Sequence, residues 1–308
     1  MSSKPGAVVR LGLIGAGRWG KNFIRTIRGL DGVTLTALCS RNPDNHALVD
    51  STCAILADWH DLPGSNLCDA VIIATPPETH AEILGTMIRA RLPSMVEKPL
   101  TLDLQEALEL QQLLRRIPTP VLVDHTYLFH PAYRELKRLG SQLGLIRSIQ
   151  SEGGNHGPFR PNFNALWDYG PHDLSMCLDL LGAGPVRMKL TQADTVSQEN
   201  GIGASYELAL VFPNDVTATI HVSNIKREKV RRFAVEFAGD RLVFDDLAPH
   251  QLVNAAATPL LVSPELPLTR AVQTFAEGVR DESHEMFGLD LAVEIVRILH
   301  DAQPALPS

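Results

Sequence analysis

The sequence predicts an α/β protein in which a doubly wound parallel sheet of the Rossmann type precedes an α+β domain. An apolar run at residues 8–14 breaks into the glycine pattern G-x-G-x-x-G. Strand and helix patterns then alternate as far as residue 123. Beyond that point, alternating runs joined by short turns favour antiparallel strand pairs. We therefore expect one domain over residues 1–123 and a second over residues 124–308.

Apolar periodicity predicts each element of the first domain. Strands are expected at residues 8–14, 33–39, 70–74, 94–96 and 121–123, and helices at 21–30, 78–91 and 104–116, the last capped by Asp103. In such sheets ligands bind outside the C-terminal ends of the strands. We therefore expect three loops, Gly15–Gly20, Thr75–Pro77 and Glu97–Pro99, to converge on one crevice.

The second domain is expected to mix helices with antiparallel strands. Helices are predicted at residues 131–140, 268–280 and 289–300, with another that ends at Leu181, and strands at 146–152, 186–193, 205–212, 216–223, 232–238 and 241–244. Residues 304–308 are expected to form a frayed tail.

The glycine pattern at the end of the first strand predicts a dinucleotide site. Gly15 permits the tight turn, Gly17 lets the main chain approach a pyrophosphate, and Gly20 lets the helix pack close to the strand. The N-terminus of that helix directs N–H groups at the phosphates. The pattern alone is weak evidence, because a glycine turn can be purely structural, but here it lies inside a βαβ unit.

The end of the second predicted strand indicates which dinucleotide is bound. NAD-binding units place an acidic residue about 20 positions after the glycines, to bind the ribose 2′-hydroxyl. Here that position falls on Ser40 and Arg41, whose hydroxyl and guanidinium groups suit a 2′-phosphate. NADP(H) is therefore favoured. NAD(H) remains possible if Arg41 is solvated and Asp44 supplies the carboxylate.

Composition excludes several classes of partner. The chain has 308 residues, 44% of them hydrophobic and 20% charged, with a net charge of −7. Nucleic acids and anionic membranes are bound by clustered Lys and Arg, so neither partner is expected. No run approaches the length of a membrane span, and the first residues lack an apolar signal core. The four cysteines show no C-x-x-C pairing, so we expect free buried thiols, no metal site and a cytoplasmic location.

One cluster in the second half of the chain has the composition of a catalytic site. Asp168 and His172 lie four residues apart near the expected start of a helix, so they share a face. A carboxylate beside an imidazole can orient it as a general base for a hydroxyl proton. Lys98, at the C-terminal end of a predicted strand, can stabilise developing alkoxide charge. The structural alternative is that Asp168 caps the helix, His172 packs in its first turn and Lys98 is an ordinary surface lysine.

These residues resemble a known family. Glu97-Lys98-Pro99, the loop Ala74–His80 and the Asp168/His172 pair are similar to the glucose–fructose oxidoreductase and inositol dehydrogenase family, Gfo/Idh/MocA. Gly17–Asn22, His125–Pro131 and Trp167–Leu174 resemble the branch that contains nucleotide-sugar 3-dehydrogenases. The resemblance implies a large, mostly antiparallel second sheet whose open face builds homodimers or homotetramers.

The resemblance also implies roles for individual residues. Lys98, Asp168 and His172 take the family's catalytic positions. Thr75, Pro76 and His80 would line the cofactor, and we place Arg18, Trp19 and Glu97 with them. The peptide bond before Pro99 is expected to be cis, and His125 and Tyr127 to approach the substrate, with ordinary packing as the alternative. Asn164, together with Arg134, Lys137 and Arg160, is a further candidate contact to an anionic or hydroxylated substrate.

The activity implied is reversible hydride transfer between a nicotinamide and a secondary alcohol of a sugar, polyol or nucleotide sugar. His172 would move the hydroxyl proton, Asp168 would orient His172, and Lys98 would polarise the same oxygen. Two alternatives remain open at this stage: a reductase of imines or tetrapyrrole-like ligands, and a non-catalytic sensor that binds a dinucleotide. Relatives with the reductase activity typically lack the Asp/His pair.

Overall fold

The computed structural model describes residues 8–160, 162–198, 201–281 and 288–302. The chain forms two compact units, one of Met1–Asp124 with Leu268–Val296 and the other of His125–Pro267 with Arg297–Ser308. The predicted domains, 1–123 and 124–308, are each continuous in sequence. In the structure the chain returns to the first unit at Leu268 and enters the second again at Arg297. The expected frayed tail at 304–308 lies outside the described residues.

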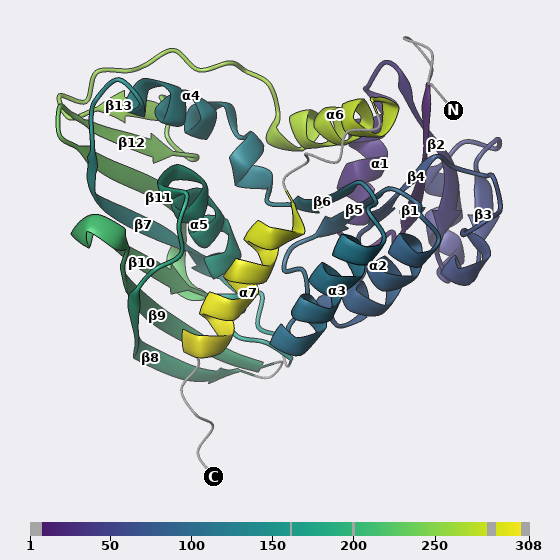
Figure 1. Cartoon of the computed structure of the whole chain (residues 1–308), viewed down its shortest axis with the longest axis horizontal. Helices are drawn as coiled ribbons and strands as arrows, with labels where there is room; N and C mark the ends of the chain where they lie inside the picture. The colour runs from purple at the N-terminus through teal and green to yellow at the C-terminus, as the bar shows by residue number, and fades with distance from the viewer. Residues whose placement is uncertain (1–7, 161, 199–200, 282–287, 303–308) are drawn as a thin grey trace. The chain divides into compact units, whose positions relative to one another are not determined.

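The first unit contains a six-stranded, fully parallel sheet, which confirms the predicted Rossmann architecture (Figure 1). Its strand order is β3-β2-β1-β4-β5-β6. The strands are β1 (Val9–Ile14), β2 (Val33–Cys39), β3 (Ala54–Leu56), β4 (Ala70–Ile73), β5 (Ser94–Glu97) and β6 (Val121–Asp124). Every residue of β4, β5 and β6 is buried, as expected for central strands covered on both faces. The sequence did not predict β3, because three residues are too few to show a period.

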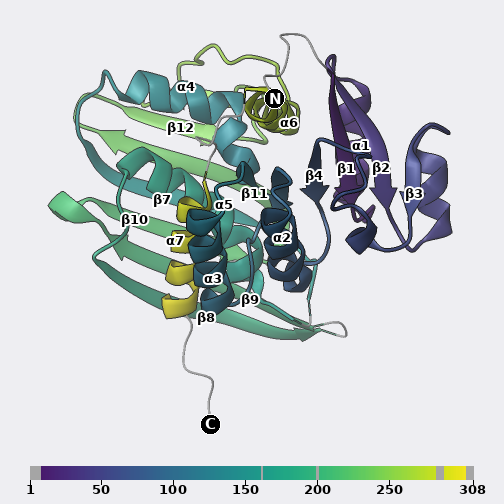
Figure 2. The same ribbon diagram turned by 45° about the vertical axis from the view of Figure 1, so that its right-hand side comes forward.

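The helices of this unit are α1 (Gly20–Arg28), α2 (His80–Arg89), α3 (Leu104–Arg116) and α6 (Pro267–Arg280) (Figure 2). The Asp103 carboxylate accepts a hydrogen bond from the Glu106 N–H at 2.9 Å, which confirms the predicted cap of α3. Helix α1 buries Phe23, Ile24 and Ile27 on one face. Helix α7 (Leu289–Ala302) passes from the first unit to the second at Val296.

The second unit contains a seven-stranded sheet, ordered β13-β12-β11-β7-β10-β9-β8. The strands are β7 (Ile146–His156), β8 (Arg187–Gln198), β9 (Gly201–Val211), β10 (Thr217–Ser223), β11 (Ile225–Phe237), β12 (Arg241–Asp245) and β13 (Leu252–Asn254). Every pair is antiparallel except β7 with β10, which confirms the predicted mostly antiparallel sheet. Two meanders, β8-β9-β10 and β11-β12-β13, flank the central strand β7.

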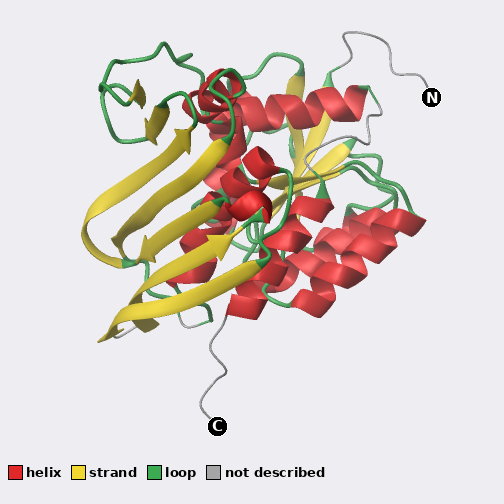
Figure 3. Ribbon diagram, turned by 60° about the vertical axis from the view of Figure 1, so that its left-hand side comes forward, coloured by secondary structure: helices red, strands yellow, loops and turns green. Residues whose placement is uncertain are grey.

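Helices cover one face of this sheet and leave the other face open (Figure 3). Helix α5 (Ala165–Leu181) packs on β7, β9 and β10, and α4 (Pro131–Gly140) packs on β12 and β13. Alternation along β11 directs Phe233, Val235 and Phe237 into this core, while Arg232 and Glu236 are exposed on the other face. The side-chain period of the strands therefore separates the core from the open face.

The start of α5 corrects one prediction. The sequence placed Asp168 near the N-cap because proline is normally confined to the first turn. The N-cap is instead Asn164, whose Oδ1 accepts hydrogen bonds from Leu166 N–H at 3.0 Å and Trp167 N–H at 3.3 Å. Pro171 consequently lies inside the helix, and Asp168 lies one turn into it. A strong capping residue and the burial of the first turn outweigh the cost of the interior proline.

Two expectations from composition can be compared with the structure. Cys39, Cys53, Cys68 and Cys177 are free and buried, as predicted. Burial raises the pKa of Cys39 to about 12, so its thiol stays protonated at neutral pH. In the described part of the chain, no helix has both the length and the apolar content needed to cross a membrane.

Candidate active site

The glycine loop between β1 and α1 has the geometry of a dinucleotide cradle. Gly15 adopts φ +93°, and a Cβ there would lie 2.7 Å from the Ala74 carbonyl oxygen. A Cβ at Gly20 would lie 2.2 Å from the Gly15 carbonyl oxygen. A Cβ at Gly17 would meet no described atom within 4 Å, so the main chain is open to a ligand there. The three glycines thus fit the roles of turn, close packing and pyrophosphate approach.

This difference between the glycines gives a prediction. We expect Gly17→Ala to leave the free energy of unfolding within about 0.5 kcal/mol of wild type but to weaken NADPH binding by at least about 10-fold, because the methyl group takes the phosphate's space. Gly20→Ala should instead destabilise the protein by about 3 kcal/mol, since its methyl group collides with main chain. Chemical denaturation and fluorescence titration measure the two effects. Equal loss of stability in both variants would contradict the assignment.

The turn after β2 presents Arg41 to solvent and holds Ser40 in place. Ser40 Oγ accepts hydrogen bonds from Asn45 Nδ2 at 3.0 Å and from the Asn42 N–H at 3.3 Å. The Ser40 hydroxyl therefore shapes the turn, while the exposed Arg41 side chain can reach a ligand. Asp44, the alternative ribose ligand, is also exposed, in the 3₁₀ helix Pro43–Leu48.

His80 joins the loops that follow β4 and β5. Its Nδ1 lies 2.9 Å from the Pro99 carbonyl oxygen and its Nε2 lies 2.9 Å from the Thr75 carbonyl oxygen. The ring is buried, and burial lowers its pKa while the two carbonyls oppose that shift. The structure thus brings the Thr75 and Pro99 loops together, as predicted, and His80 contacts their main chain. The Lys98–Pro99 bond is cis, which confirms that prediction.

Two buried carboxyl groups lie beside Lys98. Glu97 and Asp124 are paired in register at the ends of β5 and β6. Burial and the neighbouring Asp124 raise the pKa of Glu97 well above its usual range. Burial and the neighbouring carboxyl group therefore favour the neutral form of Glu97. Lys98 itself is half-buried directly after β5.

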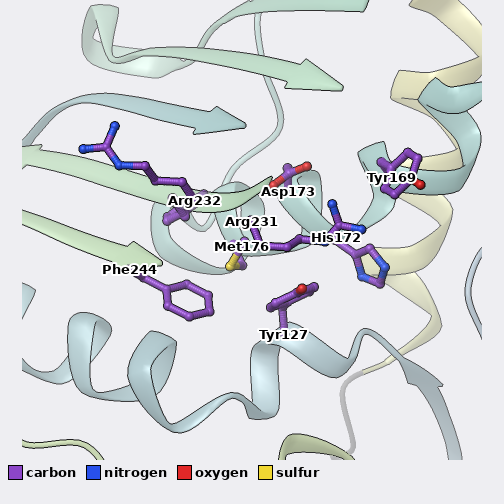
Figure 4. A pocket seen from close by; sticks show the side chains of 9 residues that line it. Tyr127, Tyr169, His172, Asp173, Met176, Arg231, Arg232 and Phe244 are labelled. Carbon is purple, nitrogen blue, oxygen red and sulfur yellow. The ribbon is translucent and has the colours of Figure 1, made fainter. Parts of the chain in front are cut away.

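The second unit contains a pocket beside the predicted base (Figure 4). The space in it is partly open to solvent. Its lining residues are Tyr127, Tyr169, His172, Asp173, Met176, Arg231, Arg232, Phe233 and Phe244. The Tyr127 and His172 rings meet edge to face, with centroids 4.9 Å apart. The structure thus brings together two of the predicted site residues, from the 3₁₀ helix Thr126–Phe129 and from α5.

A hydrogen-bond network fixes Tyr127. Its hydroxyl donates to Asp246 Oδ2 at 3.2 Å, and His130 Nε2 lies 3.1 Å from Asp246 Oδ1. His130 Nδ1 accepts the Ala132 N–H at 3.1 Å, so Nε2 carries the proton and donates it to Asp246. The hydrogen bond from His130 has the largest effect on Asp246. Together with the bond from Tyr127 it outweighs the effect of burial, so the pKa of Asp246 is lowered. The charged carboxylate therefore holds the Tyr127 ring against His172.

Asp168 and several of the predicted substrate residues have structural partners. Asp168 Oδ2 accepts a hydrogen bond from Arg160 Nε at 3.3 Å, and Asn164 caps the helix. Lys137 pairs with Asp179 at 2.8 Å. His125 is buried at the start of the second unit, next to the 3₁₀ helix that carries Tyr127. The orienting role of Asp168 on His172 remains a prediction.

Asp173 is a buried carboxyl group that the sequence did not single out. It accepts a hydrogen bond from Ser151 Oγ. A Cβ at Gly153 would lie 3.2 Å from Asp173 Oδ2 and 3.5 Å from Arg231 Nη1, so the missing side chain leaves room for both groups. Burial raises the pKa of Asp173 to about 6, against the opposing effects of Ser151 and Arg231.

The raised pKa of Asp173 predicts a pH-dependent stability. Between about pH 4 and pH 6 the unfolded carboxyl ionises while the folded one stays protonated, so stability falls as pH rises and levels off above about pH 6. We expect Asp173→Asn to remove this fall and to be more stable by up to about 3 kcal/mol at pH 8. Denaturant unfolding at several pH values measures it. The exposed Asp215→Asn is the control, and a constant difference between Asp173→Asn and wild type across pH 4–8 would contradict the prediction.

Sequence reasoning missed the charged residues Asp173, Arg231 and Arg232 of this pocket, and it missed Asp246, which holds Tyr127. Arg231 lies on the inward face of β11 with Phe233 and Val235. A charged residue at a position where the strand period expects an apolar one could have indicated a functional residue. Asp173 adjoins His172 in the chain, whereas Asp246 carried no local signal because its partners lie more than 100 residues away.

Comparison with known proteins identifies the family. The family described as an oxidoreductase family with an NAD-binding Rossmann fold, Gfo/Idh/MocA, matches residues 9–125. A protein of Magnetospirillum magnetotacticum MS-1, provisionally named an oxidoreductase, has a crystal structure and is 42% identical in sequence to this chain. The two structures superpose with a TM-score of 0.90, over 96% of this chain and 100% of the other. The chain belongs to the Gfo/Idh/MocA family of oxidoreductases.

Relatives with specific names are more distant. The UDP-N-acetylglucosamine 3-dehydrogenase of Acidithiobacillus ferrooxidans is 28% identical over 75% of this chain and 69% of that protein. An inositol 2-dehydrogenase of Rhizobium meliloti is 25% identical over 66% of this chain, and the match spans 64% of that protein. One crystal structure of the Acidithiobacillus enzyme superposes with a TM-score of 0.79 at 21% identity, covering 95% and 96% of the two chains, which shows the shared fold.

Proposed function

We propose that this protein is a dehydrogenase or reductase that transfers a hydride between a nicotinamide dinucleotide and a secondary alcohol of a sugar, polyol or nucleotide sugar. The observation that carries the proposal is the pocket of the second unit, where His172 lies against the anchored Tyr127 ring. Sugar and polyol dehydrogenases among the relatives support the same class.

The roles of the residues follow from their chemistry. His172 takes the hydroxyl proton in the oxidative direction and returns it in the other, while Asp168 orients its ring. Lys98 donates a hydrogen bond to the reacting oxygen and stabilises the charge that develops there. Gly15, Gly17 and Gly20, with the Thr75–Pro77 loop, hold the dinucleotide, which supplies the hydride acceptor when bound. We also propose that Tyr127 contacts the substrate and that the protein forms homodimers or homotetramers through the open sheet face.

We propose NADP(H) as the preferred dinucleotide. Arg41→Ala should weaken NADPH binding by about 10-fold or more and leave NADH binding unchanged, because the guanidinium group contacts only a 2′-phosphate. Fluorescence titration with both dinucleotides measures this selectivity. Asp44→Asn tests the alternative: a selective loss of NADH affinity in that variant, with none of NADPH affinity in Arg41→Ala, would assign the site to NAD(H).

A turnover assay tests the proposed activity. Bound nucleotide is released by denaturation and identified, and reduced-nicotinamide absorbance is then followed across sugars, polyols and UDP-sugars. We expect exchange with at least one of these alcohols. Tight NADPH binding with no hydride exchange on the whole panel would contradict the proposal and favour a sensor.

A further inference from the structure

Arg231 is a rigidly held cation in the pocket that also contains His172 (Figure 4). Its Nη1 donates hydrogen bonds to the Val230 carbonyl oxygen at 2.9 Å and the Gly154 carbonyl oxygen at 3.4 Å. Its Cζ lies 4.6 Å from the centroid of the buried Tyr169 ring. These contacts fix the guanidinium group before any ligand binds, so little conformational entropy is lost on binding.

The carboxylates near Arg231 are occupied by other partners. Asp173 accepts a hydrogen bond from Ser151, and Asp246 accepts hydrogen bonds from His130 and Tyr127. The ion pairs of the described chain do not include Arg231, although Asp173 lies near enough to feel its charge. A guanidinium group has five N–H donors, and the two main-chain hydrogen bonds use only Nη1. The Tyr169 side chain also accepts a hydrogen bond from Arg231. These partners use at most three of the five donors, so at least two remain for a ligand.

The direction of the side chain separates Arg231 from its neighbour in sequence. Figure 4 shows the guanidinium end of Arg231 directed toward His172 and Tyr169, whereas Arg232 extends away from them. Alternation along β11 explains this, because Arg232 pairs with Glu152 and also lines a hollow with His221 and Thr219. Arg231 is therefore the test residue. The exposed Arg227, on the same strand and outside the lining of this pocket, is the control.

We propose that Arg231 binds an anionic oxygen group of the substrate, a carboxylate or a phosphate, and so makes this protein selective for acidic or phosphorylated sugars. The inference rests on the proposed function, and it specifies the substrate class of the same site. A planar fork of donors matches the two oxygens of a carboxylate or phosphate. Neutral polyols offer no such group, so they gain little from Arg231.

The experiment compares ligands that differ in charge. Glucuronate is paired with glucuronamide, glucose 6-phosphate with glucose, and UDP-N-acetylglucosamine with N-acetylglucosamine. The value of kcat/KM is measured for wild type, Arg231→Met, Arg231→Lys and the control Arg227→Met. The shift of the thermal unfolding midpoint by each compound, with NADPH present, gives a readout without turnover. Arg231→Lys keeps the charge, so it serves if the methionine variant does not fold.

We expect wild type to favour the anionic member of at least one pair by about 10-fold or more. Arg231→Met should lose about 10- to 100-fold in kcat/KM for that compound and less than about 3-fold for its neutral partner, with Arg231→Lys between. Arg227→Met should behave as wild type. Selectivity for glucuronate alone would identify a carboxylate as the group that Arg231 binds. Selectivity for the phosphorylated compounds alone would identify a phosphate.

Two results would overturn the inference: preference of wild type for the neutral members, or equal losses on both members of a pair in Arg231→Met. The first leaves the proposed dehydrogenase activity intact if neutral sugars are oxidised. If instead no sugar is turned over while anionic sugars still raise the unfolding midpoint in an Arg231-dependent way, the proposed function fails and the anion site stands.

Discussion

Replacing His172 by alanine is expected to lower kcat by about 10²- to 10⁴-fold, because a positioned general base contributes that much to a proton transfer. The edge-to-face contact with Tyr127 and the position on α5 hold the imidazole in one place. The measurement is the rate of reduced-nicotinamide formation with a substrate found on the panel. Dinucleotide affinity should change little, because the glycine loop belongs to the other compact unit.

The control for this prediction is His221→Ala. His221 is half-exposed on β10 and lies 3.6 Å from Glu207, with no proposed role in the reaction. Its loss should leave kcat within about 2-fold of wild type. A His172→Ala enzyme that keeps more than a third of wild-type kcat would remove the imidazole from the mechanism and leave it a packing residue of the first turns of α5.

Lys98→Met is expected to lower kcat by about 10²- to 10³-fold, the range seen when one donor to a developing oxyanion is lost. The methionine side chain keeps most of the volume but has no charge and no N–H donor. A donor that stabilises the charge developing on the reacting oxygen acts in the transition state, so the loss should fall on the chemical step. Steady-state and single-turnover rates separate this step from binding.

The exposed Lys189→Met, on β8, is the control and should retain wild-type kinetics. If Lys98→Met raised KM alone and left kcat unchanged, Lys98 would bind substrate and transition state equally well. The proposed electrophilic role would then be wrong, even though the residue touches the substrate.

The local residue pattern predicted correctly those helices and strands whose ends are marked by residues such as proline and glycine. The predicted bounds of β2 and α4 match the structure, since Pro131 begins α4 and Gly140 ends it. The start of α5 was wrong, because a rule about proline was given more weight than the capping residue Asn164. Strands β3 and β13 were missed, since three residues show no alternation. Short elements are decided by their neighbours in the sheet rather than by their own residues.

The candidate site divides in the same way. The glycine loop, Lys98 and His172 could be proposed from the sequence because their signals are local: a turn, a strand end and one face of a helix. The Asp246 network and the Asp173 environment were not found, because their hydrogen bonds join residues far apart in the chain. For Ser40 the cofactor role stays a prediction, and the structure adds that its hydroxyl oxygen accepts hydrogen bonds within its own turn.

The amino-acid sequence by itself determined the order of strands and helices, the family to which the chain belongs and the types of group available for hydride transfer, because periodicity and motif spacing are properties of neighbouring residues. Only the tertiary structure decided that burial raises the pKa of Glu97 and of Asp173 and that Arg231 faces the pocket of His172. Desolvation and charge interactions depend on atoms brought together across the fold, and sequence separation carries no measure of those distances.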